Sequence, residues 1–334
     1  MKTYNAAIIG LGNIGFLLSL DPKRKGTWSH SYAYLNCERT TLVGAVEPDA
    51  EKRRLFIERF PDVQVHETID NLFANHDIDV VSICTPTATH YEVFRELSGR
   101  PVKAIFCEKP FTLNLHESRK CIEMAERSEI IVAVNHTRRW NANYRRGAVL
   151  TGLGEIGTVT TVNAFYPGQI YNIGTHLFDT IRILLNRDPI MVSGVFTSSA
   201  EKKDPSVSGV IMFKGDIFCT FAATGKREDM IFEVDVIGSE GRVQVLKNGM
   251  EVNVYRFMES KNYSGYRELG ESGKFAGDAG DPLLEAVNEI VEVLDGEKSR
   301  VSCDALDGYW SLAIVEAALQ SAREGSGFVS VQSF

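Results

Sequence analysis

The first residues with a recognisable chemistry are three glycines that follow a short apolar run. The run is Ala6–Ile9, and the segment after it reads Gly10-Leu11-Gly12-Asn13-Ile14-Gly15. Glycines at this spacing let a backbone approach a pyrophosphate closely, and the N-terminus of a following helix supplies N–H donors and a partial positive charge. The motif binds a dinucleotide when it joins a buried strand to a helix. The sequence therefore predicts a dinucleotide site at this turn.

An acidic residue is expected at the end of the second strand of such a unit, where it accepts a hydrogen bond from a ribose hydroxyl. Glu47 directly follows the strand-like run Thr41–Val46. It lies 32 residues beyond Gly15, which is about twelve more than the usual spacing. We interpret the polar segment Asp21–Tyr32 as an insertion that accounts for the excess. Because a carboxylate repels a 2′-phosphate, Glu47 predicts NAD as the cofactor, while the basic run Lys23–Lys25 leaves NADP possible.

Strand-like and helical patterns alternate through the first part of the chain. The apolar runs after the first are Thr41–Val46, Val80–Cys84, Val102–Cys107 and Ile130–Val134. A polar helical stretch covers Ala50–Phe60, and Leu115–Ser128 carries apolar residues at helical spacing. Strands that alternate with helices predict a doubly wound parallel sheet of the Rossmann type. We expect this dinucleotide-binding domain to occupy residues 1–134.

The remaining residues, 135–334, show a different pattern, which predicts a second domain. Strand-like segments follow one another with few helices between them: Thr158–Tyr166, Met191–Thr197, Val207–Phe213, Ile217–Ala223, Ile231–Ile237, Arg242–Leu246 and Glu251–Phe257. Such a series favours an open-faced, predominantly antiparallel sheet, with one face solvated or covered by a partner. Amphipathic helices are predicted at Pro282–Leu294 and Ala305–Arg323.

Composition excludes several classes of protein. The chain has 334 residues, and its 36 Lys and Arg against 44 Asp and Glu give a net charge of −8. An acidic chain lacks the basic surface of a general nucleic-acid binder. The six cysteines contain no C-x-x-C pair, so we expect neither a zinc site nor a disulfide framework, but reduced thiols in a cytoplasmic protein. The most apolar stretch, Ala6–Leu20, is interrupted by glycines, so neither a membrane helix nor a secretion signal is expected.

Five segments, taken in order, resemble one protein family. They are Gly10–Gly15, Cys84–His90, Glu108–Pro110, Asn172–Asp179 and the tail Asp304–Val331. In this order they are similar to the glucose–fructose oxidoreductase and inositol dehydrogenase (Gfo/Idh/MocA) family. The resemblance implies hydride transfer between NAD(P) and a hydroxyl carbon of a sugar, cyclitol or sugar nucleotide. It also implies a two-domain chain that forms a homodimer or homotetramer through its second sheet.

The resemblance assigns roles to two side chains. His176 matches the family's catalytic histidine, and an imidazole that titrates near neutral pH can take the hydroxyl proton. Lys109 follows a strand end, where its ammonium can donate to the substrate oxygen. Asn172 stands where the family usually has an aspartate. An amide can orient a sugar hydroxyl but cannot act as a base, so Asn172 is expected to bind substrate only.

The motifs and the resemblance together give a set of expected cofactor contacts and two further candidate substrate contacts. The expected cofactor contacts are Gly10, Gly12, Asn13, Ile14, Gly15, Glu47, Thr85, Pro86, His90, Glu108, Lys109 and Pro110. Arg139 and Trp140 are candidate substrate contacts, because a guanidinium suits phosphate or carboxylate and an aromatic face suits a sugar ring. A solvated start of a basic helix is an equal alternative. The segment Asp21–His30 lies beside the cofactor site, either as a lid or as an exposed loop.

Two other functions are compatible with the same pattern. An NAD-assisted glycosidase would oxidise its substrate only transiently and would recycle its cofactor. A non-catalytic regulator would sense the dinucleotide alone. Fold cannot decide among these, but the presence of both Lys109 and His176 favours catalysis, since a sensor does not need that pair.

Overall fold

A computed structural model describes residues 2–198, 202–277 and 279–334 of the chain. By their packing they form two compact units. The first comprises residues 2–140 and Asp281–Tyr309, and the second comprises Asn141–Gly280 and Trp310–Phe334. Residues 281–309 thus pack with the first unit, although they come late in the chain. The division of function after residue 134 stays a prediction.

The first unit is built on a six-stranded parallel sheet. Its strand order is β3-β2-β1-β4-β5-β6. The strands are β1 (Tyr4–Ile9), β2 (Thr40–Val46), β3 (Gln64–His66), β4 (Val80–Ile83), β5 (Ala104–Cys107) and β6 (Ile131–Val134). The central strands β4 and β5 are buried along their whole length, as expected for a sheet covered on both faces. The doubly wound Rossmann sheet is therefore confirmed.

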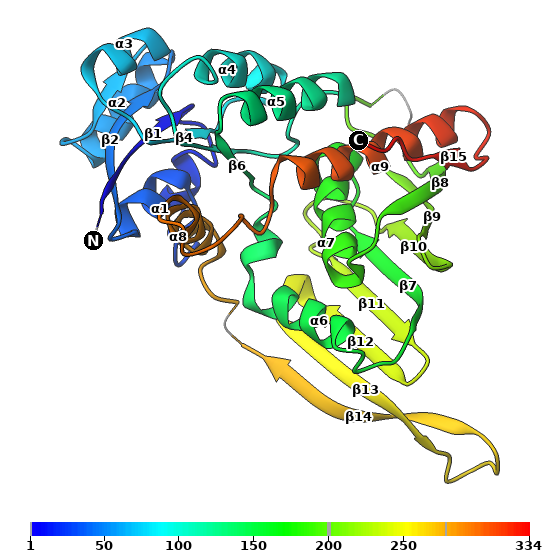
Figure 1. Ribbon diagram of the computed structural model, residues 1–334. Helices are drawn as coiled ribbons and strands as arrows, with labels where there is room; N and C mark the ends of the chain where they lie inside the picture. The colour runs from blue at the N-terminus through cyan, green and yellow to red at the C-terminus, as the bar shows by residue number, and fades with distance from the viewer. Residues whose placement is uncertain (1, 199–201, 278) are drawn as a thin grey trace. The chain divides into compact units, whose positions relative to one another are not determined.

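Helices cover both faces of this sheet. They are α1 (His30–Asn36), α2 (Ala50–Arg59), α3 (Ile69–Asn75), α4 (His90–Leu97), α5 (Leu115–Arg127) and α8 (Pro282–Leu294). Helices α4 and α5 lie together on one face, and α1 and α8 lie together on the other (Figure 1). The sequence predicted α2, α5 and α8 closely, whereas it missed α3 and α4.

The helix predicted to begin directly at the glycine turn is interrupted, which corrects that prediction. After Gly15 the chain forms a turn and a short 3-10 helix, Leu17–Leu20. The N–H groups of His30 and Ser31 then donate to the carbonyls of Ile14 and Gly15, at 3.0 and 3.1 Å. In an uninterrupted α-helix those carbonyls would accept from residues 18 and 19.

The interruption is a twelve-residue insertion looped out of the first Rossmann helix. The partners of Ile14 and Gly15 come twelve residues later than helix geometry requires, which equals the excess in the spacing to Glu47. The insertion therefore lies between Gly15 and His30. The sequence-based limit at Tyr32 was too late, because α1 begins at His30.

The second unit is built on a nine-stranded sheet of order β14-β13-β12-β11-β7-β10-β9-β8-β15. Its strands are β7 (Val159–Tyr166), β8 (Pro189–Phe196), β9 (Val207–Phe213), β10 (Ile217–Ala223), β11 (Glu233–Gly238), β12 (Gly241–Leu246), β13 (Glu251–Glu259), β14 (Arg267–Ala276) and β15 (Val329–Ser330). Apart from the parallel pair β7–β10, the neighbouring strands are antiparallel. The predicted, mostly antiparallel sheet is confirmed.

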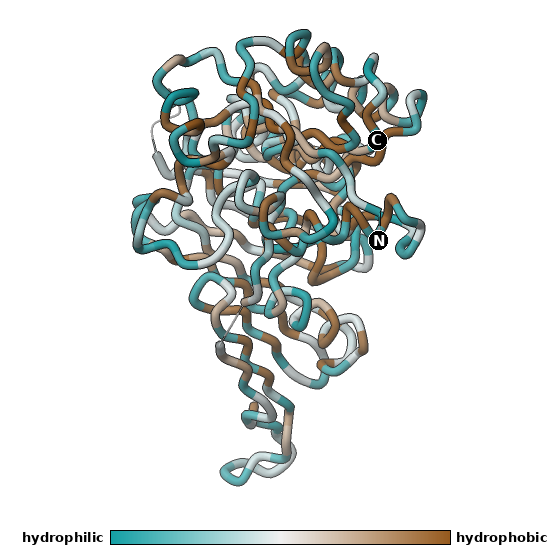
Figure 2. Tube along the Cα trace, turned by 90° about the vertical axis from the view of Figure 1, so that its left-hand side faces the viewer, coloured by the Kyte–Doolittle hydropathy of each residue, from teal (hydrophilic) through white to brown (hydrophobic). Residues whose placement is uncertain are grey.

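One face of this second sheet is buried. Along β11 and β12 buried and half-buried residues alternate, and Figure 2 shows strands that alternate between hydrophobic and hydrophilic residues. The helices of this unit are α6 (Ala142–Gly152), α7 (Thr175–Leu185) and most of α9 (Ala305–Arg323). The other face exposes Phe165 and Phe218 among polar neighbours. Assembly of several copies through that face stays a prediction.

Candidate functional site

Three loops leave the parallel sheet at the same edge, because their strands end in register. Ile9 of β1 pairs with Ile83 of β4, and Ile83 pairs with Cys107 of β5. The glycine turn follows the first strand, Thr85–Pro86 follows the second, and Glu108–Pro110 follows the third. Ligands of open α/β sheets bind outside such carboxyl ends. The structure thus brings three of the predicted segments together.

Two glycines of the turn lie so close to other backbone atoms that a side chain would collide, whereas the third has free space around it. A Cβ on Gly10, where φ is +98°, would lie 2.8 Å from the Cys84 carbonyl, and one on Gly15 would lie 2.1 Å from the Gly10 carbonyl oxygen. A Cβ on Gly12 would meet no atom within 4 Å. The backbone at Gly12 is therefore open to a ligand.

Several backbone N–H groups and one hydroxyl at this edge have no hydrogen-bond partner among the described residues. In the part of the chain that the structure describes, the N–H groups of Gly12, Asn13, Ile14 and Gly15 donate no hydrogen bond. The buried hydroxyl oxygen of Thr85 likewise has no partner among the described residues. Free N–H groups at a turn of this kind suit the oxygens of a pyrophosphate. These residues therefore fit a dinucleotide.

Two matched substitutions test this interpretation of the turn. We expect Gly12→Ala to weaken NADH binding about tenfold while leaving the melting temperature unchanged, because its Cβ enters only the space left for a ligand. We expect Gly15→Ala to lower the melting temperature as well, because its Cβ collides with backbone. NADH fluorescence titration and thermal melting measure the two effects. Unchanged NADH affinity in Gly12→Ala would contradict a cofactor at this turn.

Glu47 lies at the end of β2 beside the glycine turn, as the sequence predicted. Its side chain is only 6% exposed, and the carboxylate accepts hydrogen bonds from the N–H groups of Leu11 at 2.8 Å and Asp49 at 3.1 Å. Lys52 places its ammonium 3.9 Å away. These contacts hold a carboxylate in one orientation next to the turn, where it can accept from a ribose hydroxyl.

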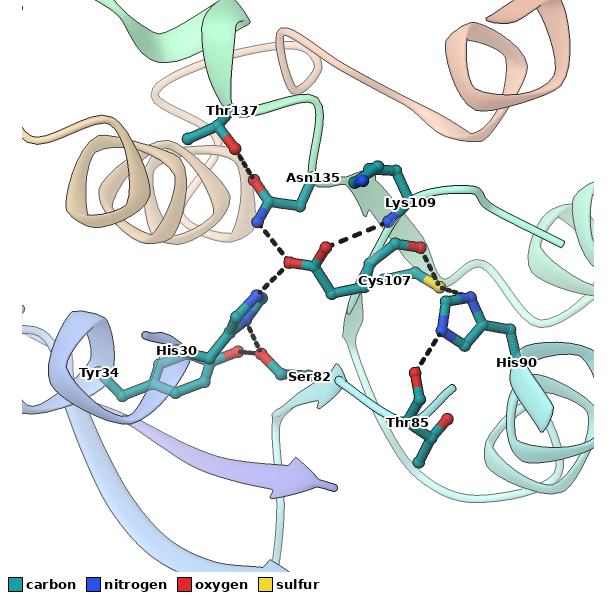
Figure 3. A network of polar contacts seen from close by, with 10 residues as sticks. His30, Tyr34, Ser82, Thr85, His90, Cys107, Lys109, Asn135 and Thr137 are labelled. Carbon is teal, nitrogen blue, oxygen red and sulfur yellow. Dashed lines mark hydrogen bonds and ion pairs between the residues drawn. The ribbon is translucent and has the colours of Figure 1, made fainter. Parts of the chain in front are cut away.

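His90 joins two of the three loops. Its ring is buried at the start of α4, and Nε2 lies 2.9 Å from the Thr85 carbonyl oxygen (Figure 3). On the other side of the ring, Nδ1 lies 3.1 Å from the carbonyl oxygen of Pro110. Burial lowers the pKa of His90, although the nearby carbonyls oppose this effect. The ring therefore fixes the positions of the loops, and a direct cofactor contact of His90 stays a prediction.

Glu108 is buried at the centre of a polar network that the sequence did not predict. Its carboxylate accepts from His30 Nε2 at 2.9 Å, from Asn135 Nδ2 at 2.5 Å and from the backbone N–H of Lys109 at 3.3 Å (Figure 3). Burial alone would raise the pKa of Glu108, but the hydrogen bonds from His30 and Asn135 and the charge of Lys109 outweigh it and lower that pKa. Glu108 is therefore a carboxylate.

Lys109 follows directly, half-buried, and its peptide bond to Pro110 is cis. The sequence analysis named Glu108 and Lys109 as expected cofactor contacts. The structure adds His30, which the sequence placed in a loop of unknown role. The spacing excess to Glu47 was the one signal that pointed toward the segment ending at His30.

In the second unit, His176 and Asn172 lie at the start of α7 on two different kinds of helical turn. His176 is half-buried in the first turn of the α-helix, whereas Asn172 lies in a π-helical turn, Ile170–Gly174. The N–H groups of Gly174 and Thr175 reach back five residues, to Gln169 and Ile170. Asn172 and His176 therefore do not lie on one continuous α-helix, and their four-residue spacing does not by itself put them on one face.

The π-helical turn is held by a carboxylate that the sequence did not single out. Asp204 accepts hydrogen bonds from the N–H groups of Tyr171 at 2.8 Å and Asn172 at 3.0 Å. The Asn172 side chain donates to Gln169 Oε1 at 3.1 Å, and Gln169 itself has a left-handed φ of 60°. Wide turns and positive φ at a non-glycine residue concentrate at functional sites.

Arg139 and Trp140 are not placed as substrate contacts, which corrects that prediction. The Arg139 guanidinium is buried, donates to the Ser302 carbonyl at 2.7 Å and pairs with Asp307 at 2.8 Å. The Trp140 ring is 1% exposed, and its indole N–H donates to Glu289 at 2.7 Å. Side chains so engaged hold the first unit together rather than meet a ligand.

Two properties concern the described residues as a whole. All six cysteines are buried and free of disulfides, and within the described ranges no cluster of three or more His, Cys, Asp or Glu side chains could hold a metal ion. None of the helices in those ranges combines the length and the apolar character needed to cross a bilayer.

Two models of a single oxidoreductase family match the chain. The model of its NAD-binding Rossmann fold matches residues 4–136, and the model of its C-terminal alpha/beta domain matches residues 160–331. Together the two matches cover most of the chain, and each falls largely on one of the two sheets.

Individual relatives are more distant. Inositol 2-dehydrogenase of Rhizobium meliloti (strain 1021) is 26% identical over 278 residues, which cover 77% of this chain and 82% of the relative. A 1,5-anhydro-D-fructose reductase of Ensifer adhaerens is 25% identical over 283 residues, 77% of this chain and 81% of the relative. An oxidoreductase from Agrobacterium radiobacter, solved with NAD⁺, L-tartaric acid and magnesium, has a TM-score of 0.79 at 16% identity and covers 99% of both chains. That likeness concerns the fold.

Proposed function

This chain belongs to the Gfo/Idh/MocA oxidoreductase family and carries its NAD-binding Rossmann domain, and we propose that it interconverts a secondary alcohol and a ketone on a small polyhydroxylated substrate. The substrate class is a sugar, a cyclitol or a sugar nucleotide. The observation that supports the proposal is the meeting of the glycine turn, Thr85–Pro86 and Glu108–Pro110 at one edge of the sheet, since Lys109 then follows a strand that ends at the same edge as the glycine turn.

The cofactor would be held by the chain's own groups at that edge. The N–H groups of Gly12–Gly15 suit the pyrophosphate, and the fixed carboxylate of Glu47 suits the ribose hydroxyls. The nicotinamide ring, when bound, accepts or donates the hydride. The contribution of the protein is to position and polarise the reacting groups.

Two side chains are proposed to handle the proton and the charge. Lys109 donates a hydrogen bond to the substrate oxygen and stabilises the negative charge that develops there as the hydroxyl is oxidised. His176 takes the hydroxyl proton in oxidation and returns it in reduction. Asn172 orients a second hydroxyl of the substrate through its amide, which cannot act as a base.

The names of the relatives support this substrate class. One is an inositol dehydrogenase and another an anhydrofructose reductase, so both act on compounds with several hydroxyl-bearing carbons. A panel of cyclitols, sugars and sugar nucleotides, assayed with NAD for oxidation and with NADH for reduction, tests the proposal through absorbance at the nicotinamide band. Net change of that absorbance with at least one compound is expected. Hydrolysis of a glycoside without any net change in the nicotinamide absorbance would favour an NAD-assisted glycosidase instead.

We expect NADH to bind at least about tenfold more tightly than NADPH. The reason is that Glu47 is fixed by two backbone N–H groups and would meet the 2′-phosphate with its negative charge. Isothermal titration with both cofactors measures the ratio of their dissociation constants. Glu47→Gln removes the charge but keeps the size of the side chain, so this ratio should move toward one. Tighter binding of NADPH by the wild-type chain would overturn this assignment of Glu47.

A further inference from the structure

A chain of polar contacts runs through the core of the first unit to the Lys109 segment. The His30 ring lies against Phe106, with ring centroids 4.5 Å apart. Its Nδ1 is 2.7 Å from Ser82 Oγ, which is 2.7 Å from the Tyr34 hydroxyl, and its Nε2 is 2.9 Å from Glu108 (Figure 3). His30, Tyr34 and Ser82 are wholly buried. Water therefore does not compete for these hydrogen bonds.

One arrangement of protons gives each hydrogen bond from Tyr34 through Ser82 and His30 to Glu108 one donor and one acceptor. Burial raises the pKa of the Tyr34 hydroxyl, so the hydroxyl keeps its proton, and Ser82 Oγ is its partner among the described residues. If Tyr34 donates to Ser82, the Ser82 hydroxyl donates to His30 Nδ1. With Nδ1 as the acceptor, Nε2 carries a ring proton and donates it to Glu108.

The opposite side of Glu108 is fixed in the same way. Asn135 Oδ1 accepts from the Thr137 hydroxyl at 3.2 Å, which orients the amide so that its Nδ2 donates to Glu108. The other carboxylate oxygen accepts the backbone N–H of Lys109. Beside these hydrogen bonds, the charge of Lys109 contributes to lowering the pKa of the Glu108 carboxyl.

We propose that His30 and Glu108 act together as a positioning pair for Lys109. The looped-out insertion ends at His30, so the same segment that interrupts the first Rossmann helix delivers the imidazole to Glu108. Glu108 in turn accepts the backbone N–H of Lys109, and the charges of the two side chains attract each other. This inference rests on the role proposed above for Lys109, and it makes the insertion part of the machinery around that lysine rather than a separate loop.

The reactivity of the Lys109 amine reports on this environment without requiring a substrate. Only the neutral amine attacks an acylating reagent, and removal of a neighbouring negative charge favours the neutral amine. The full-length protein with saturating NAD is treated with N-hydroxysuccinimidyl acetate at pH 7, 8 and 9. Peptide mass spectrometry then gives the acetylation rate of Lys109 relative to the exposed Lys103 and Lys120 of the same molecule.

Glu108→Gln is expected to raise the relative rate of Lys109 about fivefold, which corresponds to the loss of roughly 1 kcal/mol of charge attraction. His30→Phe keeps the ring packing on Phe106 but removes the hydrogen bond to Glu108, so the pKa of Glu108 rises and the carboxyl is more often neutral. It should therefore raise the Lys109 rate in the same direction. The double variant should behave like Glu108→Gln alone, because both changes act through one carboxylate.

Tyr34→Phe is the matched control. It removes a buried hydroxyl from the same network but leaves the His30–Glu108 hydrogen bond in place, so the relative rate of Lys109 should stay within about twofold of wild type. The charge of Glu108 also acts on the titratable groups Cys84, Cys107 and His90, and all variants retain them. Melting temperature and NADH titration establish that each variant is folded.

Different results bear on the positioning pair and on the catalytic role of Lys109. A Lys109 rate in His30→Phe equal to wild type, in a protein that still binds NADH, would overturn the positioning pair. Equal effects of His30→Phe and Tyr34→Phe would also overturn it, since they would show a general loss of packing. A fully active Lys109→Met would instead overturn the catalytic role of Lys109, whatever the labelling shows.

Discussion

Lys109→Met is expected to lower kcat by about 10²–10³, the usual effect of removing one donor from a developing oxyanion. Methionine keeps most of the apolar stem of the side chain and removes the ammonium. The dissociation constant of NADH should stay within about twofold of wild type, because the contact concerns the reacting oxygen rather than the cofactor. Steady-state kinetics on the substrate identified by the panel, with NADH titration, measures both.

Lys103→Met is the matched control for this change. Lys103 immediately precedes β5, at the opposite end of the strand that leads to Lys109, and its exposed ammonium pairs with Asp79. An exposed ion pair contributes little to stability, so this variant should retain full turnover. Parallel losses of NADH affinity and of kcat in Lys109→Met would mean that the lysine serves the cofactor instead of the substrate oxygen.

His176→Ala should reduce the rate of oxidation by about 10²–10⁴, which is the contribution of a positioned general base. The same substitution at His116, an exposed residue of α5, controls for the loss of an imidazole elsewhere. Rates measured from pH 5 to 10 add a second test. The fall in rate toward acid pH that a histidine base produces should be absent from the residual activity of His176→Ala. Near wild-type turnover in His176→Ala would exclude it as the base.

Asn172→Ala distinguishes binding from proton transfer at the start of α7. Because the amide would hold a hydroxyl equally in the ground state and in the transition state, its removal should raise KM by about five- to tenfold and change kcat little. Asn172 also donates to Gln169, so the melting temperature must be compared with that of wild type. A loss of kcat as large as that of His176→Ala would show that Asn172 takes part in the chemical step.

Sequence alone was sufficient for the architecture of the two sheets. Buried parallel strands appear as short apolar runs, and the ends of such strands meet at one edge whatever their separation along the chain. The resemblance to the family named the glycine turn, Thr85–Pro86 and Glu108–Pro110 together, and the ends of β1, β4 and β5 explain why these segments meet. Two short or exposed strands were not predicted from the sequence. Strand β3 has only three residues, and β14 is rich in glycine and charged residues, so neither shows an apolar run.

The partners of buried polar side chains were decided by tertiary structure. Arg139 and Trp140 have the composition of a substrate contact, yet their neighbours Asp307 and Glu289 come from segments more than a hundred residues away. His30 meets Glu108 only because the twelve-residue insertion returns the chain to the register of its helix. Apolar periodicity is a local property that a sequence displays directly. Which donor satisfies a buried carboxylate depends on which elements the folded chain packs around it, and no local pattern contains that information.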